Sequence, residues 1–350
     1  MDNSSQRKIL RVSPACEIPQ LAGEITSALV GDGPSLGFGE ITSEFAAHYA
    51  AVVIGTSGSS GSPKEVALTA TALISSARAS NKFINAKPGE TWSLLLPLTH
   101  IAAVNVIIRA IELGTLPIDL RNHEGEYPKA NYTSIVPTQL FRALNGDVRL
   151  LSHLKSAKTV LVGGAALSQS LRNQAELAGI KVVTTYGMTE TCGGCVYDGE
   201  VLDGVAIEIR NGKIAIRGPI LASSVSLDAG WYETSDLGEF KNDKLIVLGR
   251  ADDVIISGGE NLSLNAVEAS LSAAFVDVEF AAFSIEDPQW GDSLQIAVVG
   301  TVSDGELVAR LESDLGSFAK PKGIHRLTSL PLLGIGKVDR KSLAKGVAHE

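Results

Sequence analysis

Short runs of β-branched residues alternate with segments of helical length up to about residue 190. The runs at 51–54, 92–96, 132–136, 159–162 and 182–185 predict strands. The segments at 69–84 and 101–113 predict helices, and another helix is expected between Ser168, a candidate N-cap, and Gly179, a candidate stop. Such alternation is typical of an α/β fold with a parallel sheet.

After Asp203 the pattern changes to hairpins. Asn211-Gly212 is a strong two-residue turn signal, and Asn242-Asp243 lies between a second pair of predicted strands. From Arg250 onward we expect a helix at 264–274, strands at 279–285 and 294–299, a helix at 305–318 and a glycine-rich loop. Because 350 residues exceed what one hydrophobic core usually serves, we expect two domains. The larger, residues 1–249, is α/β with mixed sheets and a β-rich segment, and the smaller, residues 250–350, is a mobile α+β domain.

Composition excludes several classes of protein. With 39 acidic and 30 basic residues the net charge is −9, so no basic surface is available for nucleic acid or an anionic membrane. The longest apolar run, residues 49–54, is far shorter than the roughly 20 residues of a membrane-spanning helix. Three cysteines and a polar N-terminus argue against a disulfide framework and a secretory signal, so a cytoplasmic location is expected.

A run of hydroxyl residues and glycines directly follows the strand predicted at 51–54. Residues 56–64 read Thr-Ser-Gly-Ser-Ser-Gly-Ser-Pro-Lys. Their N–H and O–H donors and one lysine suit a polyphosphate. The Walker pattern fails, because Pro63 stands where it needs Gly and Glu65 where it needs Ser or Thr. A flexible linker is the alternative, but linkers rarely follow a buried strand.

A series of segments resembles, in order, the motifs of the acyl-adenylate-forming superfamily of acyl-CoA synthetases, adenylation domains and luciferases. They are the loop 56–64, Gly-Gly-Ala-Ala-Leu at 163–167, Tyr-Gly-Met-Thr-Glu at 186–190, Tyr-Glu-Thr-Ser-Asp at 232–236, Gly-Arg-Ala-Asp at 249–252 and Gly-Ile-Gly-Lys at 334–337. The resemblance covers residues 50–343 and implies a ligase that uses ATP, Mg²⁺ and coenzyme A. Members of this superfamily are commonly longer before the phosphate loop, so we expect part of the N-terminal subdomain to be missing.

The resemblance also implies roles for individual residues. Those for ATP or AMP are Thr56, Ser57, Gly58, Ser59, Ser60, Gly61 and Lys64 at the phosphates, Gly163, Gly164 and Ala165 beside the adenine, Tyr186, Gly187 and Thr189 near the α-phosphate, and Asp236 and Arg250 on the ribose side. Glu190 is implied as the magnesium ligand. The remaining implied residues are the catalytic Lys337 in the loop 333–340, the hinge Asp252 within 250–252, and Ser257, Gly258 and Gly259 on the CoA side.

These residue types suit the chemistry. Both reactants, a carboxylate and ATP, are anions that must be held in line while their charge is neutralised. A carboxylate such as Asp236 can accept from two ribose hydroxyls, and a lysine such as Lys337 can stabilise transition-state charge. The alternatives are a turn aspartate, a surface glutamate at 190 and a solvated surface lysine.

Within the superfamily the chain is most similar to the o-succinylbenzoate–CoA ligases of menaquinone synthesis, on the segments 97–100, 136–142 and 256–261. This substrate keeps one unreacted carboxylate, which needs a donor or cation once buried. The candidates are His100, which is also a candidate catalytic residue, Arg109 and Arg142, with Thr138 and Gln139 as neutral donors. Arg109 lies in an apolar helical run, where an unpaired arginine is costly.

Several points stay open. Cys192 and Cys195 have C-x-x-C spacing, but a zinc site wants a second ligand pair, so Gly193 and Gly194 between them are expected to leave space for a substrate ring. Glu65 stands where the family usually has Gly, which places an acid beside Lys64. Ser60 replaces Thr and Ser235 replaces Gly. A ligase for another aryl or fatty acid, a non-catalytic nucleotide-binding protein, and the oligomeric state, a homodimer included, remain alternatives.

Overall fold

The computed structural model describes residues 6–57, 63–257, 260–275, 278–287, 291–332 and 338–347. A first sheet has the strand order β3-β1-β2-β4-β5. Its strands are β1 (Gln6–Arg11), β2 (Ser35–Phe38), β3 (Phe45–Ala47), β4 (Ala50–Ser57) and β5 (Pro63–Thr69). The strands β1, β2 and β4 run parallel, and the two edge strands are antiparallel to their neighbours.

A second sheet has the order β12-β11-β10-β9-β8-β6-β7. Its strands are β6 (Trp92–Leu94), β7 (Ile118–Asp119), β8 (Tyr132–Ile135), β9 (Thr159–Val162), β10 (Val182–Met188), β11 (Gly193–Tyr197) and β12 (Glu200–Val201). The strands from β6 to β10 are parallel, which confirms the sheet predicted from the alternating pattern. The strands β11 and β12 extend it antiparallel.

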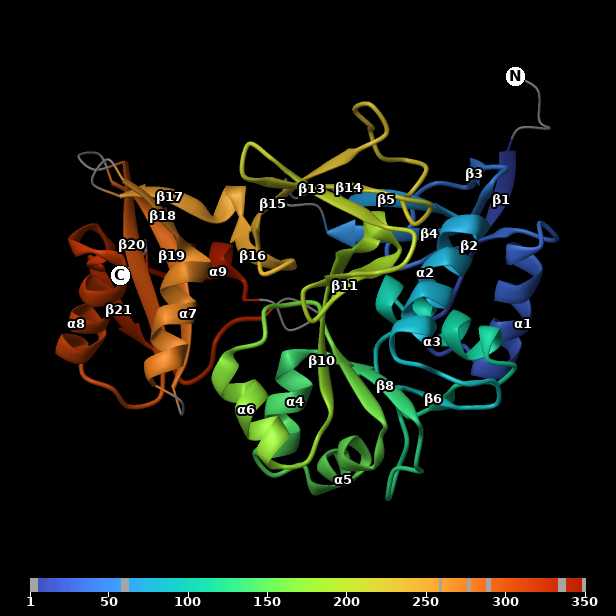
Figure 1. The fold of residues 1–350 in the computed structure, drawn as a ribbon, viewed down its shortest axis with the longest axis horizontal. Coiled ribbons are helices and arrows are strands. Elements are labelled where there is room, and N and C mark those ends of the chain that lie inside the picture. The colour runs from blue at the N-terminus through green and yellow to red at the C-terminus, as the bar shows by residue number, and fades with distance from the viewer. Residues whose placement is uncertain are drawn as a thin grey trace.

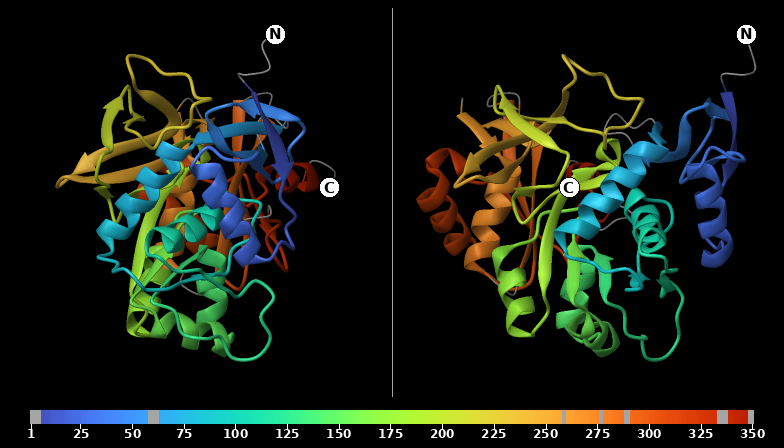
Figure 2. Two further views of the ribbon diagram at one scale, coloured as in Figure 1. Left: turned by 90° about the vertical axis from the view of Figure 1, so that its right-hand side faces the viewer. Right: turned by 45° about the vertical axis from the view of Figure 1, so that its right-hand side comes forward.

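Helices cover both faces of the second sheet. The helices α1 (Ile18–Leu29), α2 (Ala70–Phe83) and α3 (Ile101–Glu112) pack between the two sheets, where α3 contacts β6, β8 and β11 (Figure 1). Both views of Figure 2 show α1 beside the first sheet, close to the N-terminal strand. The helices α4 (Pro137–Leu144), α5 (Val148–Ser156) and α6 (Gln169–Leu177) pack with a separate cluster that includes Ile135 and Val160.

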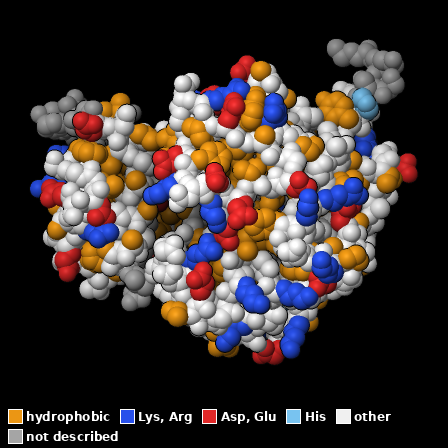
Figure 3. All heavy atoms as spheres, in the orientation of Figure 1, with side chains coloured by type: hydrophobic (Ala, Val, Ile, Leu, Met, Phe, Trp, Pro, Cys, Tyr) orange, Lys and Arg blue, Asp and Glu red, His pale blue; other side chains and the backbone are white. Residues whose placement is uncertain are grey.

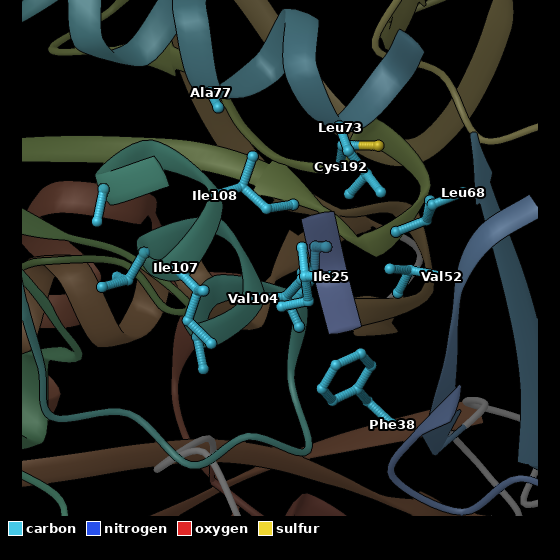
Figure 4. Packing of buried hydrophobic residues seen from close by; sticks show 14 of the residues in the cluster. Ile25, Phe38, Val52, Leu68, Leu73, Ala77, Val104, Ile107, Ile108 and Cys192 are labelled. Carbon is cyan, nitrogen blue, oxygen red and sulfur yellow. The ribbon is translucent and has the colours of Figure 1, made fainter. Parts of the chain in front are cut away.

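The main hydrophobic cluster fills the space between the first two sheets. It joins Ile25 of α1, Phe38 of β2, Leu73 of α2 and Val104 of α3 to Cys192 (Figure 4). Local hydrogen bonds explain where two of the helices start. The Thr69 hydroxyl accepts from the Ala72 amide at 3.1 Å, and the Ser168 hydroxyl accepts from the Leu171 amide at 3.2 Å, as the sequence predicted for the second.

A third sheet is entirely antiparallel, in the order β13-β14-β15-β16. Its strands are β13 (Ala206–Arg210), β14 (Lys213–Arg217), β15 (Tyr232–Lys241) and β16 (Lys244–Arg250). Both predicted turns form. Asn211 and Gly212, with φ of 50° and 79°, and Asn242 and Asp243, with 50° and 60°, have the positive φ that twisted two-residue hairpins require.

The C-terminal residues form a fourth sheet, in which β17, β18, β19, β20 and β21 pair. The elements are η3 (Ala251–Asp253), β17 (Val254–Ser257), β18 (Glu260–Ser263), α7 (Leu264–Ala274), β19 (Glu279–Asp287), β20 (Gly291–Val299), α8 (Asp304–Leu315), η4 (Ser317–Ala319), β21 (Gly323–Arg326) and α9 (Arg340–Val347). This part has a hydrophobic cluster of its own, including Val267, Ile296 and Leu307. It lies at the left of Figure 1, and Figure 3 shows a furrow between it and the rest of the surface. Across the described chain, no helix is long and apolar enough to cross a membrane.

Candidate active site

Two charged residues from distant motifs meet where β5 begins and β10 ends. Lys64 ends the predicted phosphate loop and is the second residue of β5, and its Nζ lies 3.5 Å from Oε1 of Glu190. The Lys64 side chain is 56% exposed and that of Glu190 is 17% exposed. The structure therefore brings the lysine of the predicted phosphate loop to the predicted magnesium ligand.

The Glu65 carboxylate, on the other side of β5 from Lys64, is engaged in hydrogen bonds with Thr42 and Ser43. Its Oε1 accepts from the Thr42 amide at 2.7 Å, the Thr42 hydroxyl at 2.8 Å and the Ser43 amide at 3.0 Å. Burial raises the pKa of this carboxyl, but the hydrogen bonds from Ser43 and Thr42 outweigh it and lower the pKa to about 2. The acid that replaces the usual glycine thus anchors the loop before β3, and its charge is met there.

The turn that carries Thr189 and Glu190 is the 3-10 helix η2 (Thr189–Thr191). The Cys192 amide donates to Thr189 O at 3.0 Å, and the Thr191 hydroxyl donates to Gly193 O at 2.7 Å. Before the turn, a Cβ on Gly187 would lie 2.0 Å from Gly193 O, so the close antiparallel pairing of β10 and β11 requires glycine there. This packing explains the glycine of the Tyr-Gly-Met-Thr-Glu motif.

On the predicted ribose side, Asp236 is held between two partners. The Tyr186 hydroxyl donates to Asp236 Oδ2 at 2.8 Å, and Arg250 Nη1 lies 3.9 Å from Oδ1. Burial, followed by the charge of Asp236, raises the pKa of Tyr186. Burial, then the charges of Glu190 and Asp236, raises the pKa of Tyr232 to about 12. Tyr232 therefore lies in the field of both acids, a position that the sequence analysis did not assign to it.

The predicted adenine side is an exposed backbone edge at the end of β9. Gly164 and Ala165 are exposed, and Gly164 has a φ of 85°, which favours glycine. A Cβ on Gly163 would lie 2.2 Å from the Thr185 hydroxyl, so this glycine lets the segment approach β10. The segment thus runs beside the strand that leads to Tyr186.

The residues predicted to bind the second carboxylate of the substrate differ in how deeply they are buried. Arg109 is 4% exposed; its Nη2 donates to the Tyr197 hydroxyl at 3.0 Å, and its guanidinium lies 5.2 Å from the Trp92 ring centroid. Its Nε has no hydrogen-bond partner, and none of the ion pairs among the described residues includes Arg109. Arg109 is therefore a buried cation whose Nε is still available to donate a hydrogen bond to an acceptor.

The other candidates are placed differently. Arg142 pairs with Asp147 at 3.2 Å with its side chain 61% exposed, which disfavours a role with a buried anion. Gln139 accepts from the Val136 amide at 3.0 Å and donates to Leu95 O at 3.2 Å, so both ends of its amide are in use. Thr138 is exposed. His100 occupies the N-cap position of α3.

The two nearby cysteines point into different cores. Cys192 belongs to the cluster between the first two sheets, and Cys195 packs with Val196 and Ile214. Burial raises the pKa of both thiols, that of Cys195 to about 12. The described residues contain no group of three or more His, Cys, Asp or Glu that could hold a metal. Cys192 lies just before β11 and Cys195 lies within it, and each packs into a different hydrophobic cluster.

A family model for AMP-binding enzymes matches residues 24–219, more than half of the chain. The chain belongs to the AMP-binding enzyme family. It is 38% identical over 331 residues to a probable 2-succinylbenzoate–CoA ligase of Mycobacterium tuberculosis, covering 86% of this chain and 85% of that protein.

Solved structures give the same fold for this AMP-binding enzyme. A structure of the Escherichia coli enzyme MenE with bound OSB-AMS matches with a TM-score of 0.76 and 25% identity, over 97% of this chain and 82% of that one. The Bacillus subtilis o-succinylbenzoate coenzyme A synthetase in complex with ATP and magnesium matches with a TM-score of 0.73 and 24% identity, over 95% and 82%. The expected fold class, a large N-terminal α/β domain followed by a small C-terminal one, is confirmed.

Glu190 suits a magnesium ion in this AMP-binding enzyme. Magnesium commonly takes one or two carboxylates and completes its shell with substrate phosphates and water. The Lys64 ammonium lies 3.5 Å from this carboxylate, which is 17% exposed, so the carboxylate faces a positive charge and remains partly accessible. Gly58, Ser59, Ser60, Gly61, Gly258, Gly259 and Lys337 lie outside the described residues, and only the backbone is described for Ser57, Asp252 and Ser257.

Proposed function

We propose that this AMP-binding enzyme is an acid–thiol ligase that joins 2-succinylbenzoate to coenzyme A, a step of menaquinone synthesis. The acid first displaces pyrophosphate from ATP to give the acyl-AMP. The CoA thiol then attacks the activated carbonyl and releases AMP. The substrates are soluble small molecules, so we place the reaction in the cytoplasm.

The observation that carries the choice of acid is the buried Arg109. A buried guanidinium is costly unless an anion and good hydrogen bonds compensate it. In the described structure its contacts are Tyr197, Ser134 and the Trp92 ring, which are all neutral. 2-Succinylbenzoate keeps one carboxylate after the other is activated, and that group would supply the missing charge. The similarity to the mycobacterial ligase supports the same substrate.

The remaining roles follow from the contacts at the strand ends. Lys64 would hold phosphate oxygens, and Asp236, oriented by Tyr186, would accept from the ribose hydroxyls. Magnesium at Glu190 would neutralise phosphate charge. Lys337 would stabilise the charge of the adenylation transition state. We also propose the domain boundary at residues 249 and 250 and the hinge at Asp252.

The test is a product assay. Purified protein is incubated with ATP, Mg²⁺, CoA and one of a panel of acids, namely 2-succinylbenzoate, benzoate and a fatty acid, and the acyl-AMP and thioester are identified by mass. We expect both products with 2-succinylbenzoate. If only another acid gave a thioester, the assignment of 2-succinylbenzoate as the substrate would be wrong. If no acid gave AMP, the assignment as a ligase would be wrong.

A further inference from the structure

Two helices hold one backbone carbonyl at the end of the turn that carries Glu190. Asn105 of α3 donates through Nδ2 to Cys192 O at 2.5 Å, and Ser76 of α2 donates through its hydroxyl to the same oxygen at 2.9 Å. Both side chains are 1% exposed. Figure 4 shows Cys192 beside Leu73 of α2, close to the residues of α3.

The carbonyl that they hold belongs to a strained residue. Cys192 has a φ of 51°, in the left-handed region that costs a residue with a side chain about 1 kcal/mol or more. Gly193 follows with a φ of 92°, and a Cβ there would lie 2.3 Å from Asn105 Nδ2. Such a conformation persists only where the surroundings fix it, so Asn105 and Ser76 fix this bend from outside the turn.

The bend is continuous with Glu190. The Cys192 amide donates to Thr189 O at 3.0 Å and closes the turn, and the Ala222 amide donates to Glu190 O at 2.8 Å. A change in the direction of the Cys192 carbonyl would therefore turn the Thr189–Thr191 segment and the carboxylate that it presents.

One polar atom of Asn105 is unsatisfied, which costs free energy. Its Oδ1 is buried without a hydrogen-bond partner. A buried unsatisfied polar atom costs about 1–3 kcal/mol, and an apolar side chain would avoid that cost. The amide is thus explained by its donor, which holds Cys192.

We propose that Asn105, assisted by Ser76, is a positioning residue for the metal ligand Glu190. The inference rests on the proposed function of Glu190. Residues behind a metal ligand typically change metal affinity about 10-fold to 100-fold when they are mutated.

The chain offers a matched control. Asn81 of α2 is also buried, at 6% exposure, with its Oδ1 unpartnered and its Nδ2 donating to a backbone carbonyl. That carbonyl is Arg109 O, at 3.0 Å, within α3 and not at the turn. Replacing Asn81 therefore removes an equivalent amide without touching the Cys192 bend.

The experiment measures binding, not turnover. Mg²⁺ is titrated calorimetrically into the protein saturated with a non-hydrolysable ATP analogue, with no acid and no CoA. We expect Asn105→Ala to weaken Mg²⁺ binding about 10-fold, and Ser76→Ala, the milder change, to weaken it less. Asn81→Ala should bind Mg²⁺ like the parent while lowering Tm, as Asn105→Ala does.

Equal Mg²⁺ affinity in the parent, Asn105→Ala and Ser76→Ala would overturn the inference. If Asn105→Ala does not fold, Ser76→Ala decides alone, because it removes one of the two donors and leaves the other. Unchanged affinity in Glu190→Gln would remove both the metal role of Glu190 and the inference. In that case the proposed function would be decided separately, by the assay of thioester formation from 2-succinylbenzoate.

Discussion

Lys64 Nζ lies 3.5 Å from Glu190 Oε1, although 126 positions separate the two residues in the sequence. One is the last residue of the predicted phosphate loop and the other lies in the turn after β10. Their contact places the cation that would hold ATP phosphates against the carboxylate that would hold magnesium.

Removing the cation should weaken the use of ATP. We expect Lys64→Met to lower kcat/KM for ATP about 100-fold, in the range found when one charge-stabilising donor is lost, with KM for CoA unchanged. Lys82→Met is the matched control, since Lys82 pairs with Asp203 at 2.6 Å on the exposed surface. Pyrophosphate exchange measures the effect, and equal losses in both variants would contradict the role of Lys64.

Removing the buried cation should affect the acid. Arg109→Met is expected to raise KM for 2-succinylbenzoate at least about 10-fold, because a lost charged hydrogen bond costs about 1.5–3 kcal/mol, and to leave KM for ATP near that of the parent. The exposed Arg142→Met should change neither constant. Steady-state kinetics with each substrate varied in turn would show an unchanged acid KM if Arg109 does not meet the substrate.

The loop that contacts β5 should respond to acid through Glu65. Its pKa in the folded protein is about 2, below the ordinary value of 4.5. Its contribution to stability is therefore complete above about pH 4.5 and is lost as the pH falls toward 2. We expect Glu65→Gln to be less stable than the parent at pH 7, with a difference that shrinks as the pH falls below 4.5. Urea unfolding at several pH values measures it, and a difference that grows on acidification would contradict this assignment.

Arg340 should stabilise the C-terminal sheet. Its guanidinium contacts Asp253 at 3.2 Å, Asn265 at 3.1 Å, Glu268 at 2.9 Å and Ala282 O at 2.8 Å. Because these side chains are mostly buried, Arg340→Ala leaves two acids without their partner and is expected to cost about 2–3 kcal/mol. Arg326→Ala, which removes an exposed pair with Asp304, should cost less than about 1 kcal/mol. Amide hydrogen exchange in α7 and β19 measures the effect. Equal exchange rates in the two variants would contradict a stabilising role for the contacts of Arg340.

Local chemistry made part of the fold predictable. The hydroxyl caps of α2 and α6 and the residues of the two hairpin turns act within a few positions of their own backbone, so their pattern is visible in the sequence. The strands β1, β2, β3 and β5 and the helix α1 were not predicted. Short strands gain stability from pairing with partners far along the chain, and no local signal records that pairing.

The sequence by itself determined the family, the order of the motifs and the residue types that the chemistry needs. Only the tertiary structure decided which of them meet and which are buried. Arg109 and Arg142 are both arginines near helix ends, but packing against Trp92 and Tyr197 buries the first, while the second faces solvent. Asn105 and Tyr232 acquired their places beside Cys192 and the site acids in the same way. Burial and distance depend on contacts across long stretches of chain, and spacing along the sequence does not encode them.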